Sequence, residues 1–426
     1  MTSSAINFDF LSHCPHLSCG EAVRADSSRC TRACEKCGSD LVICSSCGAT
    51  NRPMTVYCRG CKQRNRFEVC PVHRGLQAVG ASLNSIQMID QIQAPFPKRF
   101  AGTVLASPLA VDGLLVLAFS DGRVLLISEN RGSTVGQIVS SGKIAVTPAL
   151  KDGFLFVAAD SHLETYDLTR SLYHLAVPLL KPVWTAQAVG GTIISPLLVD
   201  DKSVYLVTRE GEQILLEAVS RSDGGRAWAE PLSLGANRIV PPVLIKDILV
   251  LVTLDGEASV IDPARGAVSE AFKLQSMIDP EVSPYVVSDR MLLADCGGNL
   301  LEISCGRNGF VCNHLFGQRG RISSIAASES HIAVGHMAGL TLLNSRGHAM
   351  WSNNSLEPVS VSPIITGESI FAIDDSGLGL LFDVLRSNPV ERVKVLSREV
   401  SLPPLITHSN IVAASADGEL SLIVWR

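Results

Sequence analysis

Thirteen cysteines occur in this 426-residue chain, and ten of them lie before residue 71. The most regular group consists of two C-x-x-C pairs, Cys44 with Cys47 and Cys58 with Cys61, separated by ten residues. Each C-x-x-C turn directs two thiolates at one point, and two such turns on facing hairpins complete a tetrahedron about 2.3 Å from a zinc ion. A redox C-x-x-C would instead occur singly within a βαβ pattern. The spacing therefore predicts a structural zinc site.

A second and less regular group precedes this one, with Cys14 and Cys19 followed by Cys34 and Cys37. Read together, the four turns resemble a double zinc ribbon, which would cover roughly residues 10–65. The resemblance implies a second structural zinc ion held by these four cysteines. The first turn, C-x₄-C, is two residues longer than the C-x-x-C of that family.

The longer first turn leaves its ligands open, because His13, His16 or Cys30 could replace one of the cysteines. A third site is a further alternative, since Cys70 and His73 have C-x-x-H spacing and could bind with Cys30 and a histidine of the first turn. The competing interpretation is a buried thiol beside a surface histidine.

The first 75 residues are expected to form this tandem zinc-ribbon domain. They are too poor in aliphatic side chains to build a sufficient apolar core, so metal binding must supply the folding free energy. All-cysteine sites are normally closed, whereas a catalytic zinc needs an open position and a nearby general base. The metal is therefore predicted to be structural.

The rest of the chain is built from copies of one unit, first seen at residues 102–128. Two apolar runs, one of them Leu114–Phe119, are joined by a turn at Asp112–Gly113. A second turn at Asp121–Gly122 leads to an alternating run, Val124–Ile127. Asp-Gly between apolar runs is a strong hairpin signal, because a type I′ turn needs positive φ at both central residues.

Eight copies align on a leading proline and on an Asp-Gly-like turn, at steps of 39–48 residues. The leading positions are Pro108, Pro148, Pro196, Pro242, Pro284, Ser324 in place of a proline, Pro363 and Pro404. A period near forty residues with four strand-sized segments and no helical pattern is typical of propeller blades. We predict an all-β fold, an eight-bladed β-propeller over residues 101–426, preceded by the small tandem zinc-ribbon domain.

Residues 76–100 are expected to form a linker and a ring-closing strand. The eighth copy reaches only its third strand at Val424–Arg426, so its outer strand must come from elsewhere. The strand-like segment Ser85–Ile92 is the predicted donor, because pairing it there removes two exposed strand edges.

The repeats resemble the quinoprotein-type, or pyrroloquinoline-quinone-like (PQQ-like), propeller repeat. Its "dG" turn, "ald"-like strand and "Gkxxw" tail are matched by segments that end at Trp228 and Trp351, and Trp184 precedes another copy. The resemblance implies that these tryptophans pack between neighbouring blades, where a large aromatic area is buried. The dehydrogenases of that family need calcium-binding carboxylates, a catalytic aspartate and a periplasmic location, none of which maps onto this sequence.

Catalytic motifs are absent: the sequence contains no P-loop, HExxH, GxSxG or GxGxxG. Most aspartates of the repeats, such as Asp121, Asp255 and Asp417, occupy turn positions where they shape the backbone. The cysteines outside the first domain, Cys296, Cys305 and Cys312, are expected to be small core or edge residues. We predict no enzymatic activity, with a quinone-dependent dehydrogenase as the least favoured alternative.

A basic strip ends the second ribbon, with no acidic residue between Val56 and Phe67; its members are Arg59, Lys62, Arg64 and Arg66. Such a strip could bind phosphates, with Tyr57 and Phe67 available for stacking on a base. The favoured interpretation is that these charges offset the negative thiolate-zinc centres. Nucleic-acid binding remains the alternative function.

Net charge is only -5, and no apolar run approaches the eighteen residues of a membrane-spanning helix. The first residues, MTSSAINFDFLSHC, have neither the basic nor the apolar segment of a secretory signal. Together with thiols paired for metal, this predicts a reducing, cytoplasmic location. We expect a bacterial adaptor or scaffold that docks protein partners on the propeller faces and the zinc ribbons.

Chelation provides the first test. Removing zinc from the purified full chain is expected to unfold the first 75 residues while the ring keeps its β-sheet signal, because only the former depends on metal for folding. Metal analysis should give two zinc ions per chain, or three if Cys30, Cys70 and His73 bind one. Loss of the β-sheet signal on chelation, or a chain without zinc, would contradict the prediction.

Overall fold

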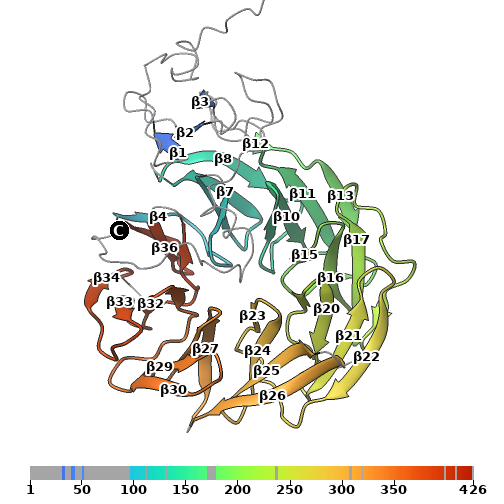
Figure 1. The fold of residues 1–426 in the computed structure, drawn as a ribbon. Helices are drawn as coiled ribbons and strands as arrows, with labels where there is room; N and C mark the ends of the chain where they lie inside the picture. The colour runs from blue at the N-terminus through green and yellow to red at the C-terminus, as the bar shows by residue number, and fades with distance from the viewer. Residues whose placement is uncertain are drawn as a thin grey trace, which may run out of the picture.

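The computed structural model describes twelve segments of the chain: residues 31–33, 40–43, 50–51, 96–111, 113–129, 132–169, 179–235, 238–306, 309–318, 320–397, 400–407 and 410–424. From residue 96 onward they form a ring of antiparallel sheets, as predicted for a propeller (Figure 1). Each copy of the repeat forms one blade, and eight blades are present.

The first four blades run outward from the ring centre in chain order. Blade 1 contains β5 (Leu109–Val111), β6 (Leu114–Ala118), β7 (Arg123–Ser128) and β8 (Thr134–Val139), with β12 (Leu179–Leu180) added in parallel to β8. Blade 2 contains β9 (Ala149–Lys151), β10 (Phe154–Ala159), β11 (His162–Asp167) and β13 (Trp184–Gln187). Blade 3 pairs β14 (Thr192–Ile193) and β15 (Leu198–Val199) with β16 (Ser203–Glu210), followed by β17 (Gln213–Ser220) and β18 (Leu232–Ser233). Blade 4 contains β19 (Val243–Ile245), β20 (Ile248–Val252), β21 (Glu257–Asp262) and β22 (Ala267–Lys273).

The last four blades have the same four-stranded order. Blade 5 contains β23 (Tyr285–Val287), β24 (Arg290–Ala294), β25 (Asn299–Gly306) and β26 (Gly309–Gly317). Blade 6 contains β27 (Ile322–Ala327), β28 (His331–His336), β29 (Gly339–Asn344) and β30 (Ala349–Asn353). Blade 7 contains β31 (Ile364–Thr366), β32 (Ser369–Ile373), β33 (Leu378–Asp383) and β34 (Glu391–Lys394). Blade 8 contains β35 (Leu405–Ile406), β36 (Asn410–Ala414), β37 (Glu419–Val424) and β4 (Phe96–Arg99).

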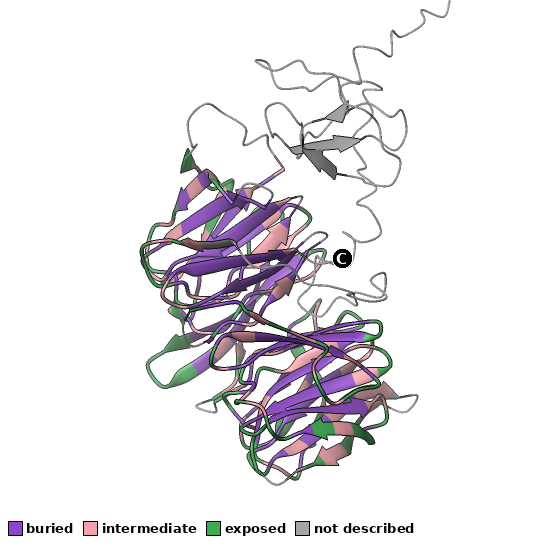
Figure 2. Cartoon of the chain, turned by 90° about the vertical axis from the view of Figure 1, so that its left-hand side faces the viewer, coloured by how far each residue is buried: buried purple, intermediate pink, exposed green. Residues whose placement is uncertain are grey.

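The apolar core is divided among the interfaces between blades. One hydrophobic cluster lies between each neighbouring pair, and a cluster that includes Leu117, Phe119, Val412 and Leu420 joins blade 8 to blade 1. The second strand of a blade is therefore buried on both faces, as in β6, where all five residues are buried. Figure 2 shows buried residues running along the strands within the ring. This explains why these strands read as continuous apolar runs rather than alternating ones.

Ring closure follows the predicted principle but uses a different segment. The outer strand of blade 8 is β4, which pairs antiparallel with β37. The chain then continues directly into blade 1, with the N–H groups of Phe100 and Val104 bonded to Gly418 and Ala416 at 2.8 Å. The expected donor Ser85–Ile92 is therefore wrong, and it lies outside the described residues. Among the described residues, the strand that pairs with β37 is β4, a few residues before the first contacts of blade 1.

Two hairpin turns in the first two blades differ in kind. Between the first and second strands of blade 2, Asp152 and Gly153 both have positive φ, 49° and 78°, as a type I′ turn requires. Between the second and third strands of blade 1 only the glycine does: Gly122 has φ 94° and its N–H donates to the carbonyl of Phe119 at 3.2 Å, whereas Asp121 is not left-handed. This pattern is a type I turn completed by a glycine bulge.

Three tryptophans join neighbouring blades, as the resemblance implied. The indole N–H groups of Trp184, Trp228 and Trp351 donate to carbonyls of the next blade at 3.2, 2.8 and 2.8 Å. A glycine of the next blade lies against two of these rings; a Cβ on Gly266 would lie 2.5 Å from a ring atom of Trp228. Positive φ and this close packing explain the glycine of the repeat tail.

Residues 31–33, 40–43 and 50–51 form a separate three-stranded antiparallel sheet, β1 (Thr31–Ala33), β2 (Asp40–Ile43) and β3 (Thr50–Asn51). Ala33 pairs with Asp40 at one end of β2, and Ile43 pairs with Thr50 at the other. The connections of this sheet therefore leave from opposite ends of its middle strand.

No helix in the described part of the chain is long and apolar enough to cross a membrane.

Trp228→Ala is expected to destabilise the ring by about 3–5 kcal/mol, because it empties a nearly fully buried position between blades 3 and 4. Trp228→Phe should cost less, since most of the packing is kept. Denaturant unfolding monitored by circular dichroism would measure both. The control is Met350→Ala, at an exposed position; equal effects of the control and Trp228→Ala would contradict this account.

Candidate interaction surface

One face of the ring, called here the link face, carries the links between blades together with the turns between second and third strands. Hydrogen bonds hold links and turns side by side: Ser120 N–H donates to Thr103 O at 3.0 Å, and Cys296 N–H donates to Met277 O at 2.9 Å. In the described residues, these hydrogen bonds tie the links to the strand ends beside them.

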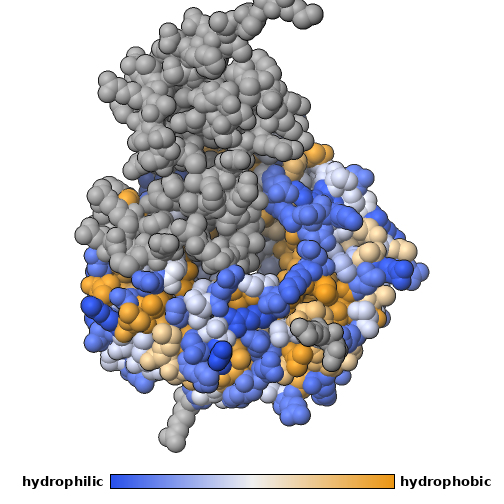
Figure 3. Space-filling view, in the orientation of Figure 1, coloured by the Kyte–Doolittle hydropathy of each residue, from blue (hydrophilic) through white to orange (hydrophobic). Residues whose placement is uncertain are grey.

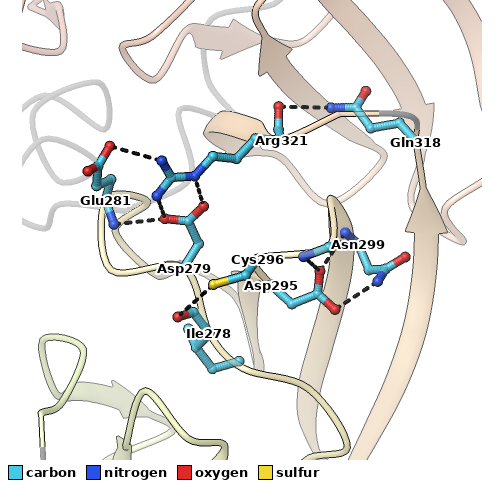
Figure 4. A network of polar contacts seen from close by, with 9 residues as sticks. Ile278, Asp279, Glu281, Asp295, Cys296, Asn299, Gln318 and Arg321 are labelled. Atoms are coloured by element: carbon cyan, nitrogen blue, oxygen red, sulfur yellow. Dashed lines mark hydrogen bonds and ion pairs between the residues drawn. The ribbon is translucent and has the colours of Figure 1, made fainter.

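An ion pair between successive links is the main polar feature of this face. Arg321, just before blade 6, donates two guanidinium hydrogen bonds to both carboxylate oxygens of Asp279, just before blade 5 (Figure 4). Glu281 adds a second carboxylate 3.3 Å from the guanidinium and donates its backbone N–H to Asp279 at 3.0 Å. The Asp279 side chain is fully buried, whereas that of Arg321 is 46% exposed. The guanidinium is therefore held in place while part of it stays accessible.

The surroundings of Asp279 favour its charged form. Burial alone would raise the pKa of Asp279, but hydrogen bonds from Arg321 and from the N–H of Glu281 outweigh it, so the pKa lies below its ordinary value. The same carboxylate raises the pKa of Arg321 above its ordinary value through hydrogen bonding. Both groups stay charged throughout the physiological range of pH.

In the neighbouring turn of blade 5, the carboxylate is hydrogen-bonded by groups of the turn itself. Asp295 accepts hydrogen bonds from the N–H groups of Gly297 and Asn299 and from the Asn299 side-chain amide, at 2.7–2.9 Å (Figure 4). Burial would raise the pKa of Asp295, yet these bonds lower it overall. The Cys296 thiol lies 3.6 Å from the carbonyl of Ile278. This carboxylate therefore shapes the turn.

Large apolar side chains are exposed on the same face. Met277 is 66% exposed in the link before blade 5, and Met337 is 68% exposed in the second turn of blade 6. Val189 is exposed in the link before blade 3. Methionine is flexible and polarizable, and it is often used where a surface adapts to a partner. The view in Figure 3 shows hydrophobic residues interspersed with hydrophilic ones over the described ring surface.

The described residues contain no group of three or more His, Cys, Asp or Glu side chains placed to hold a metal ion. On the link face, the carboxylate of Asp279 is engaged by arginine and that of Asp295 by backbone N–H groups. What this arrangement can do chemically is present a fixed guanidinium on a face that also carries exposed apolar side chains.

The predicted zinc ligands lie outside the described residues: Cys14, Cys19, Cys30, Cys34, Cys37, Cys44, Cys47, Cys58, Cys61, Cys70 and His73. The basic strip lies outside them as well, with Arg59, Lys62, Arg64 and Arg66. The zinc sites and the nucleic-acid alternative therefore stay predictions.

The predicted turn aspartates are placed as expected, whereas Cys296 is exposed in a turn and is not the core or edge residue expected. Asp121 accepts the N–H of Arg123 at 3.1 Å and Asp255 accepts the hydroxyl of Thr253, so both shape their turns. Cys305 and Cys312 are half-buried residues of β25 and β26.

The Asp279–Arg321 pair was not predicted, although one signal was present. The two residues are 42 positions apart, close to one repeat, and each belongs to the link that leads into its blade. Opposite charges one repeat apart therefore mark candidate bridges between successive links. The exposed methionines gave no such signal, because apolar residues are common throughout the repeats.

A family model described as "Outer membrane protein assembly factor BamB" matches residues 120–309. No curated protein matches the chain.

Solved structures share the ring. BamB from Moraxella catarrhalis is 15% identical, with a TM-score of 0.60, over 78% of this chain and 100% of that one. Sqt1 from Saccharomyces cerevisiae is 16% identical, with a TM-score of 0.61, over 80% of this chain and 100% of that one. A quinohemoprotein alcohol dehydrogenase from Comamonas testosteroni is 11% identical, with a TM-score of 0.64, over 84% of this chain and 81% of that one. At these identities the similarities show the fold alone.

Acid unfolding tests the Asp279–Arg321 pair. Because the folded pKa of Asp279 lies below its unfolded value, the pair contributes stability at neutral pH that is lost as pH falls below about 4. Arg321→Gln is expected to cost roughly 1–3 kcal/mol at neutral pH and to move acid unfolding to higher pH. Arg265→Gln removes an exposed arginine from a 3.9 Å surface pair and serves as the control. Identical acid-unfolding curves for the two variants would contradict the assigned role.

Proposed function

We propose that the protein is a non-enzymatic scaffold that docks a protein partner on the link face of its propeller. The observation that carries this proposal is the fixed, half-exposed guanidinium of Arg321 on the same face as the exposed side chains of Met277 and Met337. Anchors of this kind, a held arginine with apolar neighbours, often dominate protein interfaces. The rigid ring lowers the entropy lost on binding.

The family match supports the same class of function. The matched family is described as an outer membrane protein assembly factor, and it covers residues 120–309, which include Asp279 but not Arg321. We infer from it a role within a multi-component assembly rather than a particular pathway. A bacterial, cytoplasmic adaptor remains our proposal, on the basis of the thiol pairs expected to bind zinc.

The first 75 residues are proposed as a second docking module held by structural zinc. Residues 34–39 connect β1 to β2 and residues 44–49 connect β2 to β3. Since these connections start at opposite ends of β2, the C-x-x-C pairs within them are expected to serve different metal ions. This supports two sites, one with Cys34 and Cys37 and one with Cys44 and Cys47.

The test compares three purified full-length proteins: the wild type, the double variant Met277→Glu/Met337→Glu, and a rim control Val268→Glu/Val390→Glu at similarly exposed positions. Partners captured from source cells are identified and purified, and their dissociation constants are measured directly. We expect the link-face variant to weaken binding at least about tenfold, equivalent to about 1.4 kcal/mol, while the control binds normally.

Equal binding by all three proteins would refute docking on the link face. Capture of nucleic acid that depends steeply on salt, and is lost when Arg59, Lys62, Arg64 and Arg66 are replaced by serine, would instead support the alternative function.

A further inference from the structure

The outer strands of the blades are sheet edges, and most of them are protected. Unpaired edges invite association, and proteins blunt them with charge, proline, short length or a covering segment. Here β4 reads FPKR, β34 reads ERVK, and β22 reads AVSEAFK. The outer strand β8 is covered by β12. The remaining outer strands β13, β18 and β30 have five residues or fewer.

The outer strand of blade 5 is the least protected of the described outer strands. Its one interruption is a bulge at Leu315, where the register with β25 shifts between Leu300 and Leu301. β26 reads GFVCNHLFG, is the longest strand in the described part of the chain with nine residues, and contains neither charge nor proline. It is the last strand in its sheet, on the rim of the ring (Figure 1). Val311 is 48% exposed, and Asn313 and His314 are also exposed. A long, neutral strand is therefore presented at the rim.

The direction of its backbone groups follows from one contact. The N–H of Phe310 donates to the side chain of Glu270 on β22, at 3.4 Å, and so points away from β25. In an antiparallel strand, backbone groups alternate between the two neighbours. The N–H and C=O groups of Cys312 and His314 therefore also point outward, whereas those of Asn313 point toward β25.

The sequence of β26 is nearly the same read from either end. Around Asn313, cysteine matches histidine, valine matches leucine, phenylalanine matches phenylalanine, and glycine matches glycine. A two-fold interface places the same surface patch of each subunit against the other, so it requires self-complementary chemistry. A strand that is symmetric about its central residue meets this requirement when it pairs antiparallel with a second copy of itself.

We propose that β26 pairs with β26 of a second copy of this chain, forming a homodimer with its two-fold axis at Asn313. Cys312 and His314 then exchange backbone hydrogen bonds with His314 and Cys312 of the second copy. Val311 lies opposite Leu315 of the second copy, the residue at which β26 bulges against β25, so regular pairing is centred on residues 312–314. Pairing over residues 311–315 leaves the bond between Phe310 and Glu270 intact, and the two four-stranded blades become one eight-stranded sheet.

The dimer would present two link faces, and two copies of the first module, on one particle. Binding to an assembly with repeated sites would then gain from effective concentration without any new contact. This consequence adds to the proposed scaffold function, but the pairing itself does not depend on that function.

The first experiment uses charge at the two-fold axis. Asn313→Lys places two like charges directly opposite each other, as does Asn313→Asp, and like charges at such positions are unfavourable. In analytical sedimentation of the full chain, the wild type is expected to dimerise. The dimer dissociation constant of each variant alone should be about fivefold higher, or more, than that of the wild type. An equimolar mixture of the two variants should restore the dimer. Val268→Lys, on the outer strand of blade 4, is the control and should leave the dimer unchanged.

The second experiment tests the register in which the two β26 strands pair. The two Asn313 residues would form a pair without mutual hydrogen bonds, with Cα atoms about 4.5 Å apart, so Asn313→Cys should form a disulfide between copies on mild oxidation. Val311→Cys should not, because the two positions would be more than about 7 Å apart. Wild type treated in the same way provides the baseline for the native cysteines.

A wild-type chain that stays monomeric at about 100 μM would have a dimerisation free energy weaker than about 5.5 kcal/mol. Such a chain would overturn the proposal. So would a dimer that both charge variants leave unchanged, or a Val311→Cys crosslink as efficient as that of Asn313→Cys. Restoration of the dimer only in the mixture of opposite charges would support it even if either variant were less stable.

Discussion

Burial of each sheet on both of its faces is the constraint on which the whole ring depends. A blade of this protein has apolar side chains on both sides of its central strands, so it needs a neighbour on each side. A row of such blades would leave two apolar faces exposed, and only closure into a circle covers them. The hydrophobic cluster between blades 8 and 1 is the one that closes this circle.

Hydrogen bonds of buried polar groups add to the apolar clusters at the junctions between blades. Buried carboxylates accept backbone N–H groups from the link that precedes their own blade: Glu164 from Ser141, Glu217 from Val189, and Glu419 from Ser397. At the closure, buried Glu129 of blade 1 accepts hydrogen bonds from Thr407 and Asn410 of blade 8. A buried carboxylate is costly unless it is hydrogen-bonded, so these contacts fix the rotation of one blade against the next. The Asp279–Arg321 pair performs the same task and also reaches the surface.

The same rigidity separates the two kinds of surface on the ring. The link face consists of segments tied to strand ends, and its exposed methionines have flexible side chains. The rim consists of outer strands whose backbone groups point outward, and its properties depend on whether each edge carries charge. Docking on the link face depends on side chains, whereas pairing on the rim depends on main-chain hydrogen bonds.

The sequence by itself determined the repeat, the number of blades, the positions of the turns and the role of the tryptophans. These features depend on local patterns: apolar runs between Asp-Gly turns, and a glycine and tryptophan at fixed places in each copy. The type of the second turn, the true closing strand and the pairing of β12 with β8 were decided only by the tertiary structure. So were the partners of Asp279 and Glu129, which lie 42 and about 280 residues away. The physical reason is that each of these depends on how neighbouring blades are rotated and spaced, and that is known only once the circle has closed.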